Sequence, residues 1–260
     1  MSRVRSVAIP LISGPGSFSY DTPHRGAVIP LGLQAFSQFI PSLPGFTNDF
    51  AKQMNSPAAR QMLWRHYDPK TGAIGEAPER TAFKAELERV GGWPRRPRTL
   101  ALANGAGDSS GLKIPPGDVA LTVDKIFPGT TFITQAGGNA TVAELKRRFP
   151  AAEKTITTKD LPELDSAPGG TLDSFEILAD ALRAKGATID LRHPTVCFVP
   201  TVSAVSIRDI DEQSDLYSSV DQLDPNEADL DDFHTSGTNT PHTAITHELG
   251  QWLVDRIGDR

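Results

Sequence analysis

The chain has 260 residues, enough for one large domain or for one domain with an inserted subdomain. Its net charge of −6 argues against nucleic acid or an anionic membrane as the main partner, and no apolar run reaches the roughly 18–20 residues that span a bilayer. A hydrophobic share of 38%, together with 21 prolines and 22 glycines, predicts a chain rich in loops.

The amino-terminal part predicts a strand followed by helices. Residues 1–12 carry two arginines and a short apolar run that Pro10 interrupts, which does not fit a secretory signal. Ser17–Tyr20 is a short aromatic run that leads into a turn, as the end of a strand does. Ser56-Pro57-Ala58 then offers an N-cap followed by a proline at the first helical position.

A second helix is predicted further along, where Phe83, Leu87 and Val90 recur at spacings of four and three. Prolines separate the helical pieces of this region. We therefore interpret residues 30–95 as a helical, lid-like insert, and residues 1–29 and 96–260 as the core into which it is inserted.

The carboxy-terminal part alternates predicted strands with predicted helices. The strands are expected at 99–104, 119–123, 130–134 and 195–200, and the helices at 173–185 and 244–257. Phe175, Leu178 and Leu182 share one side of the first of these helices, and Gly186 stops it. Cys197, the only cysteine, lies in the apolar run 196–199, which predicts a buried, unreactive thiol and excludes an internal disulfide.

Residues 209–232 hold ten Asp and Glu residues but no Lys or Arg. The segment lacks the glycine turn and ligand spacing of a calcium loop, so we interpret it as a solvated acidic loop. His247-Glu248 invites comparison with a zinc-binding helix, but position 251 is Gln where the second histidine would stand. We therefore expect no metal and no cofactor.

His242 is the strongest candidate for a catalytic base. It lies in the polar loop 239–243, directly before the last predicted helix. A loop at this place lets an imidazole point over the carboxyl ends of the strands while the sheet fixes its backbone.

Asp108 is the candidate for the carboxylate that orients this base, because it follows a predicted strand and a Gly-x-Gly turn. Asp165 is its main rival and stays open as an alternative. Gly107-Asp108-Ser109-Ser110-Gly111 formally matches the Gly-x-Ser-x-Gly nucleophile motif. That motif needs a helix after the serine, and Pro115-Pro116 oppose one, so Ser109 is only a weak candidate for the nucleophile.

Several short segments resemble the downstream part of bacterial lipase-like α/β-hydrolases, and the turn around Thr22-Pro23-His24-Arg25-Gly26 is the most specific of them. These segments are 21–26, 56–63, 102–105, 198–204 and Pro241-His242. The resemblance implies an α/β fold, namely an incomplete α/β-hydrolase-like parallel sheet with a helical lid insert. It also implies that His242 is the general base and that Pro23, His24 and Arg25 line the substrate site.

The region that carries the nucleophilic serine in this family lies upstream of the part that this chain resembles. We therefore expect the serine to come from an upstream segment or from a second chain, and the chain alone to be inactive or weak. The expected substrate is a small-molecule or lipid carboxylic ester. The alternative is a non-catalytic α/β domain that binds a protein partner through its helical insert and acidic loop. Neither interpretation involves nucleic acid or a membrane-spanning segment, and the sequence does not indicate a cellular location.

Overall fold

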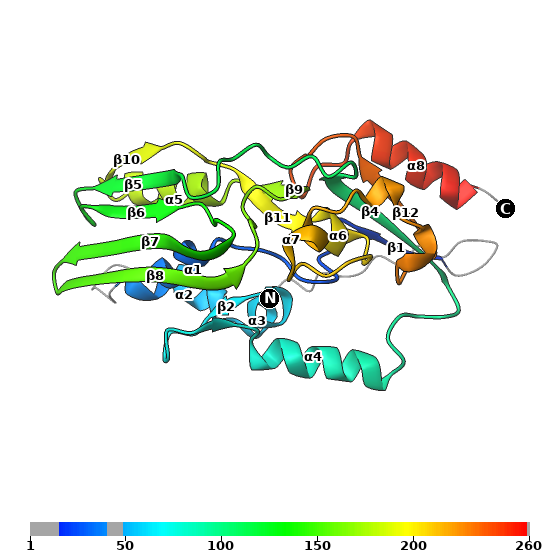
Figure 1. The fold of residues 1–260 in the computed structure, drawn as a ribbon, viewed down its shortest axis with the longest axis horizontal. Coiled ribbons are helices and arrows are strands. Elements are labelled where there is room, and N and C mark those ends of the chain that lie inside the picture. The colour runs from blue at the N-terminus through cyan, green and yellow to red at the C-terminus, as the bar shows by residue number, and fades with distance from the viewer. Residues whose placement is uncertain (1–15, 41–48, 259–260) are drawn as a thin grey trace.

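Two sheets lie toward opposite ends of the molecule, with helices packed around them (Figure 1). The structure, a computed structural model, describes residues 16–40 and 49–258, so the interrupted apolar run at 1–12 lies outside the described residues. The prediction of an α/β fold is confirmed at the level of class, since the structure is mixed α/β. No helix in the described ranges is long and apolar enough to cross a bilayer.

The smaller sheet is parallel and has the order β1-β4-β12, with β1 at Gly16–Tyr20, β4 at Arg98–Ala106 and β12 at Asp232–Ser236. The middle strand, β4, is buried from Thr99 onward because its small and apolar residues are covered on both faces. All three strands run in one direction. Their carboxyl ends therefore meet at one edge, where the chain segments after Tyr20, Ala106 and Ser236 begin.

A short pair of antiparallel strands packs against this sheet so closely that the backbones are in contact. It consists of β9 (Gly169–Leu172) and β11 (Val196–Pro200). Glycines allow the approach, since a Cβ added to Gly105 would lie 2.4 Å from the Cα of Gly169. The helix α6 (Thr201–Ala204) follows β11, and α8 (His247–Gly258) contacts β12.

The larger sheet is antiparallel, which the sequence analysis did not predict. The helices α1 and α5 pack against it, and Phe132 of the sheet lies fully buried with Phe36 of α1 and Phe175 of α5. The strands follow the order β10 (Thr188–Leu191), β5 (Val119–Asp124), β6 (Thr130–Ile133), β7 (Gly138–Arg148) and β8 (Ala151–Leu161), and the helices are α1 (Leu31–Phe39) and α5 (Ser174–Arg183).

Each sheet has its own hydrophobic core. One core is formed by α1, α5 and the antiparallel sheet, and the other by β4, β11, α6 and the segment that follows α6. Leu112 and Leu161 pack against both cores and so mark the junction between them.

The segment that was interpreted as a lid is divided between two environments. Its first helix, α1, is built into the antiparallel sheet's core, whereas α4 (Pro78–Arg89) projects from the molecule (Figure 1). Residues 81–90 are all exposed, including Phe83 and Leu87, so the predicted apolar face exists but faces solvent. The remaining elements of the segment are α2 (Asp49–Met54), α3 (Pro57–Met62), β2 (His66–Tyr67) and β3 (Ile74–Gly75).

The acidic segment is more structured than a solvated loop. Asp229 forms an ion pair with Arg25, Asp211 forms one with Arg65, and Asp231 accepts hydrogen bonds from Thr99. The segment ends at the first residue of β12, a strand that was not predicted from the sequence. Its other elements are α7 (Gln213–Leu216) and the 3-10 turns η1 (Val220–Gln222) and η2 (Pro225–Glu227).

Candidate active site

A buried carboxylate lies at the carboxyl edge of the parallel sheet. Asp21 directly follows β1, has a φ of 45° and is completely buried. Its Oδ1 accepts a hydrogen bond of 2.8 Å from the backbone N–H of Asn104, and its Oδ2 lies 2.7 Å from Nδ1 of His242. Both oxygens of this carboxylate are therefore occupied, one of them by an imidazole.

His242 enters this contact from the loop between β12 and α8. Its backbone N–H donates a 2.9 Å hydrogen bond to the carbonyl of Thr171 in β9, and its ring meets Phe198 edge-on at a centroid distance of 4.9 Å. The side chain is 27% exposed. Within the described part of the chain no hydrogen bond reaches Nε2, so that nitrogen remains available for proton transfer.

Asn104 holds both members of this Asp–His pair. While its backbone N–H binds Asp21, its side-chain Nδ2 donates to the carbonyls of Pro241 and His242 at 2.8 and 2.9 Å. The hydroxyl of Tyr20 donates to the carbonyl of Ala244, two residues after the histidine. Strands β1 and β4 thus fix the loop that carries the imidazole, even though the loop belongs to a different part of the sequence.

The electrostatics of the pair follow from its burial. Burial raises the pKa of the Asp21 carboxyl above its usual value, and the hydrogen bonds from His242 and from the Asn104 amide oppose this rise. A carboxylate at Nδ1 keeps the ring proton on that nitrogen and stabilises the imidazolium when Nε2 takes up a second proton. The arrangement is therefore suited to general-base chemistry at Nε2.

The structure places the predicted acid residues elsewhere. Asp108 is exposed and accepts a hydrogen bond from the N–H of Ser110 in its own turn, which lowers the pKa of its carboxyl. Asp165 is buried and accepts a 2.8 Å hydrogen bond from the N–H of Gln135. The carboxylate that contacts His242 is that of Asp21, because Asp21 follows the strand next to β4 and lies beneath the histidine loop.

Ser109 has a φ of 69°, and the residues that follow it form no helix. The helix required by the nucleophile motif is therefore absent after this serine. The buried state predicted for Cys197 is confirmed, and burial raises the pKa of its thiol well above the usual value. Such a thiol is a poor nucleophile.

Pro23, His24 and Arg25 form the turn that follows Asp21. Nε2 of His24 lies 2.9 Å from the hydroxyl of Ser19, and its ring meets Trp93 edge-on. Burial, with a contribution from the charge of Arg25, lowers the pKa of His24 to about 4. The side chain of Arg25 pairs with Asp229. The turn is thus tied to its neighbours, and its expected role in substrate binding stays a prediction.

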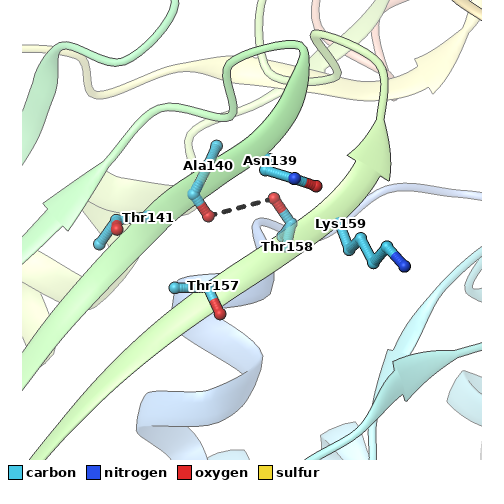
Figure 2. A pocket seen from close by; sticks show the side chains of 6 residues that line it. All are labelled: Asn139, Ala140, Thr141, Thr157, Thr158 and Lys159. Atoms are coloured by element: carbon cyan, nitrogen blue, oxygen red, sulfur yellow. Dashed lines mark hydrogen bonds between the residues drawn. The ribbon is translucent and has the colours of Figure 1, made fainter.

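Among the described residues, no group of three His, Cys, Asp or Glu side chains lies close enough together to hold a metal ion. A hollow of about 330 Å³ lies along β7 and β8, where polar side chains and Ala140 line it (Figure 2). None of its lining residues belongs to the Asp–His pair; they are Asn139, Ala140, Thr141, Thr157, Thr158 and Lys159.

Comparisons with protein families, with curated proteins and with solved structures found no match for this chain. The chemistry of the Asp–His pair therefore rests on its own geometry.

Sequence reasoning identified the histidine but missed Asp21 and Asn104 as its partners. A signal for Asp21 was present, since it is an acidic residue directly after a predicted strand, at the edge where functional residues of parallel sheets gather. Asn104 carried no comparable signal, because its role depends on which loop lies above it.

Proposed function

We propose that this chain is the acid–base part of a carboxylic-ester hydrolase of the lipase-like α/β-hydrolase type. His242 acts as the general base, and Asp21 takes the orienting role that the sequence analysis gave to Asp108. The observation that carries the proposal is the 2.7 Å contact between a fully buried carboxylate and Nδ1 of a partly exposed imidazole. Its place at the carboxyl edge of a parallel sheet adds support.

In this mechanism Nε2 of His242 removes the proton from a serine hydroxyl as the oxygen attacks the ester carbonyl. The same nitrogen then donates that proton to the departing alkoxide. Asp21 remains ionised throughout and stabilises the imidazolium in the low-dielectric setting that its burial creates. Asn104 keeps the two groups at their distance, so it positions the base without contacting the substrate.

The proposal includes a nucleophile from outside the described residues. Within the described residues, no hydroxyl or thiol forms a hydrogen bond with Nε2 of His242. A serine from an upstream segment or a second chain completes the site. In keeping with an incomplete α/β-hydrolase-like sheet, β1 is an edge strand among the described strands, and a further strand could pair beside it. Within the predicted insert at residues 30–95, the exposed helix α4 contributes the lid-like part, because α1 belongs to the core of the antiparallel sheet. The substrate is a small-molecule or lipid ester.

Hydrolysis of a p-nitrophenyl ester tests this function. The purified 260-residue chain is expected to be close to background, and the chain joined to the sequence encoded upstream is expected to be active. His242→Ala should abolish that activity and Asp21→Asn should lower it strongly, while the matched variant Asp108→Asn should leave it unchanged. Activity that survives His242→Ala, or turnover by the chain alone that Ser109→Ala removes, contradicts the proposal.

A second candidate function is a non-catalytic domain that binds a protein partner. It is favoured by α4, where Phe83, Leu87 and Val90 expose one apolar stripe. Two results would favour this candidate. The extended chain would show no esterase activity, and His242→Ala would alter only the local structure around residue 242.

A further inference from the structure

Two turns of the antiparallel sheet project side by side at one end of the molecule. They are the β5–β6 turn (124–129) and the β7–β8 turn (148–151), and both lie at the left of Figure 1, away from the parallel sheet. Their adjacency follows from the register, because the hydroxyl of Thr130 accepts a 2.9 Å hydrogen bond from the N–H of Lys146. A Cβ added to Gly129 would lie 3.3 Å from Cδ of Lys146. We call these two turns the hairpin end.

The hairpin end exposes apolar side chains at its tips. Phe149 is 83% exposed, the highest value among the large hydrophobic residues of the described ranges, and Ile126 on the neighbouring turn is 39% exposed. Phe149 lies at the tip of its turn, so most of its side chain meets water. Burying such a side chain is favourable, which makes its exposure a cost in the isolated chain.

The same end is basic although the chain as a whole is acidic. Lys125 and Arg148 are exposed next to Ile126 and Phe149 at the two tips. Lys146 and Arg147, which precede Arg148 in β7, are partly exposed. Acidic residues at this end include Asp124, Glu153 opposite Lys146, and Glu144 further along β7. The chain's densest acidic segment, 209–232, packs with the parallel sheet's core instead. The net charge of −6 therefore does not describe the local field at this end.

The β7–β8 turn is held in shape from behind. Nε of Arg147 donates a 2.9 Å hydrogen bond to the carbonyl of Pro150. Nη1 of the same guanidinium donates to the carbonyl of Phe39 at the end of α1. The guanidinium also lies over the Phe39 ring. A turn fixed in this way presents Phe149 outward with little loss of entropy on binding.

We propose that the hairpin end docks on the surface of an anionic lipid bilayer. Phe149 and Ile126 enter the boundary between headgroups and acyl chains, and Lys125 and Arg148 lie among the lipid phosphates. Two convex tips suit a fluid surface that closes around them, whereas a folded protein partner must offer a matching hollow. A nucleic acid could use the basic residues and stack on Phe149, but it would leave the aliphatic Ile126 without a role. The surface is separate from the Asp–His pair and does not depend on the proposed hydrolysis.

The contributions of individual residues are measurable. Loss of Phe149 removes most of the inserted apolar surface and should weaken partition to vesicles by about tenfold or more. Removal of one exposed basic residue near an anionic surface should weaken it about fivefold, and charge reversal should do more. High salt should weaken binding further, because it screens the basic residues.

Vesicle co-sedimentation of the full 260-residue chain tests the inference. The probes are vesicles of phosphatidylcholine with phosphatidylserine and vesicles of phosphatidylcholine alone. The variants are Phe149→Ala and Arg148→Glu, and the matched control is Phe83→Ala, which removes an exposed phenylalanine from α4 instead. Circular dichroism of each variant checks that the fold is retained.

The expected result is binding to the phosphatidylserine vesicles that Phe149→Ala and Arg148→Glu weaken and Phe83→Ala leaves unchanged. Absence of binding to these vesicles overturns the inference, and so does binding that Phe149→Ala leaves intact. The inference is also overturned if DNA binds tightly, competes with the vesicles and depends only on the basic residues. The hairpin end would then be a site for a polyanion. Esterase assays do not enter this test, so its failure is distinguishable from failure of the proposed function.

Discussion

The 2.7 Å contact with the Asp21 carboxylate favours the His242 tautomer that carries its proton on Nδ1, because an ionised carboxylate can only accept a hydrogen bond. In Asp21→Asn the amide oxygen can still accept the N–H of Asn104, so the amide nitrogen turns toward the imidazole and donates to it. The ring should then carry its proton on Nε2, the wrong tautomer for a general base. Nitrogen-15 chemical shifts of the imidazole, recorded in alkaline buffer, distinguish the two tautomers.

The matched variant for this measurement is Asp108→Asn, which should leave the tautomer unchanged because Asp108 bonds within its own turn. An unchanged spectrum in Asp21→Asn would mean that the carboxylate does not set the tautomer. In a chain supplied with a nucleophile, the same substitution should lower kcat by about 10⁴-fold, as tautomer reversal does in serine proteases.

At the scale of single elements, α4 is held to the rest of the molecule by the buried Arg80 and by an ion pair between Glu79 and Arg60. Arg80 donates hydrogen bonds to the carbonyls of Arg25 and Gln61, and it is 5% exposed. Arg80→Ala should lower the free energy of unfolding by about 2–3 kcal/mol, because it leaves these two carbonyls without their charged donor. Urea unfolding measures the change.

Arg89 of the same helix is the matched control for this prediction. It is exposed and pairs with Glu86 on the surface, so Arg89→Ala should cost less than about 0.5 kcal/mol. Equal effects of the two substitutions would show that α4 is not held through Arg80.

The close crossing of β9 over the Asp–His pair gives a second prediction at this scale. A Cβ added to Gly170 would lie 1.9 Å from Oδ2 of Asp21, so Gly170→Ala forces the strand or the carboxylate to move. We expect a loss of about 2–3 kcal/mol in the free energy of unfolding and a displaced His242 resonance. Chemical denaturation and the imidazole spectrum report these two effects.

Gly237→Ala in the histidine loop provides the comparison, since nothing lies within 4 Å of the added methyl. It should change stability by less than about 0.5 kcal/mol. If Gly170→Ala were equally mild, β9 would not constrain the carboxylate.

At the scale of the whole molecule, Asp165 joins the two cores. Its side chain binds the N–H of Gln135 after β6, and its backbone carbonyl accepts the N–H of Cys197 in β11. Burial raises the pKa of this carboxyl from 3.8 to about 6, so the fold favours its protonated form. The group's contribution to stability is therefore present below pH 3.8 and is lost as the pH rises through about 6.

The loss corresponds to about 3 kcal/mol for a shift of this size. Asp165→Asn cannot ionise, so its free energy of unfolding relative to the native chain should rise by about that amount between pH 4 and pH 7. Denaturant titrations at the two pH values measure it, with the exposed Asp160→Asn as the control. A difference that does not change with pH would contradict the prediction.

The sequence predicted those features that depend on neighbours within a few residues. The helix with Phe175, Leu178 and Leu182 forms α5, and these three side chains are buried in the core of the antiparallel sheet. The apolar run around Cys197 forms β11. His242 lies in a loop before the last helix, as expected. In each case the periodicity or composition of a short segment is sufficient to specify the local structure.

Other features of the fold did not follow from local pattern. The β7–β8 hairpin carries charged residues along much of its length, so alternation did not mark it as two long strands. The stripe of Phe83, Leu87 and Val90 predicted a helix correctly, but periodicity does not state whether another element covers it. Whether a face is buried depends on elements that are distant in the sequence.

The sequence by itself determined the helices and strands with regular patterning, and it placed His242 in a loop before the last helix. Only the tertiary structure decided that the partner of His242 is Asp21, 221 residues away, in place of Asp108. The reason is physical. A hydrogen bond between distant residues depends on the order of parallel strands and on how closely glycine backbones allow β9 to approach, and no stretch of neighbouring residues encodes either of these.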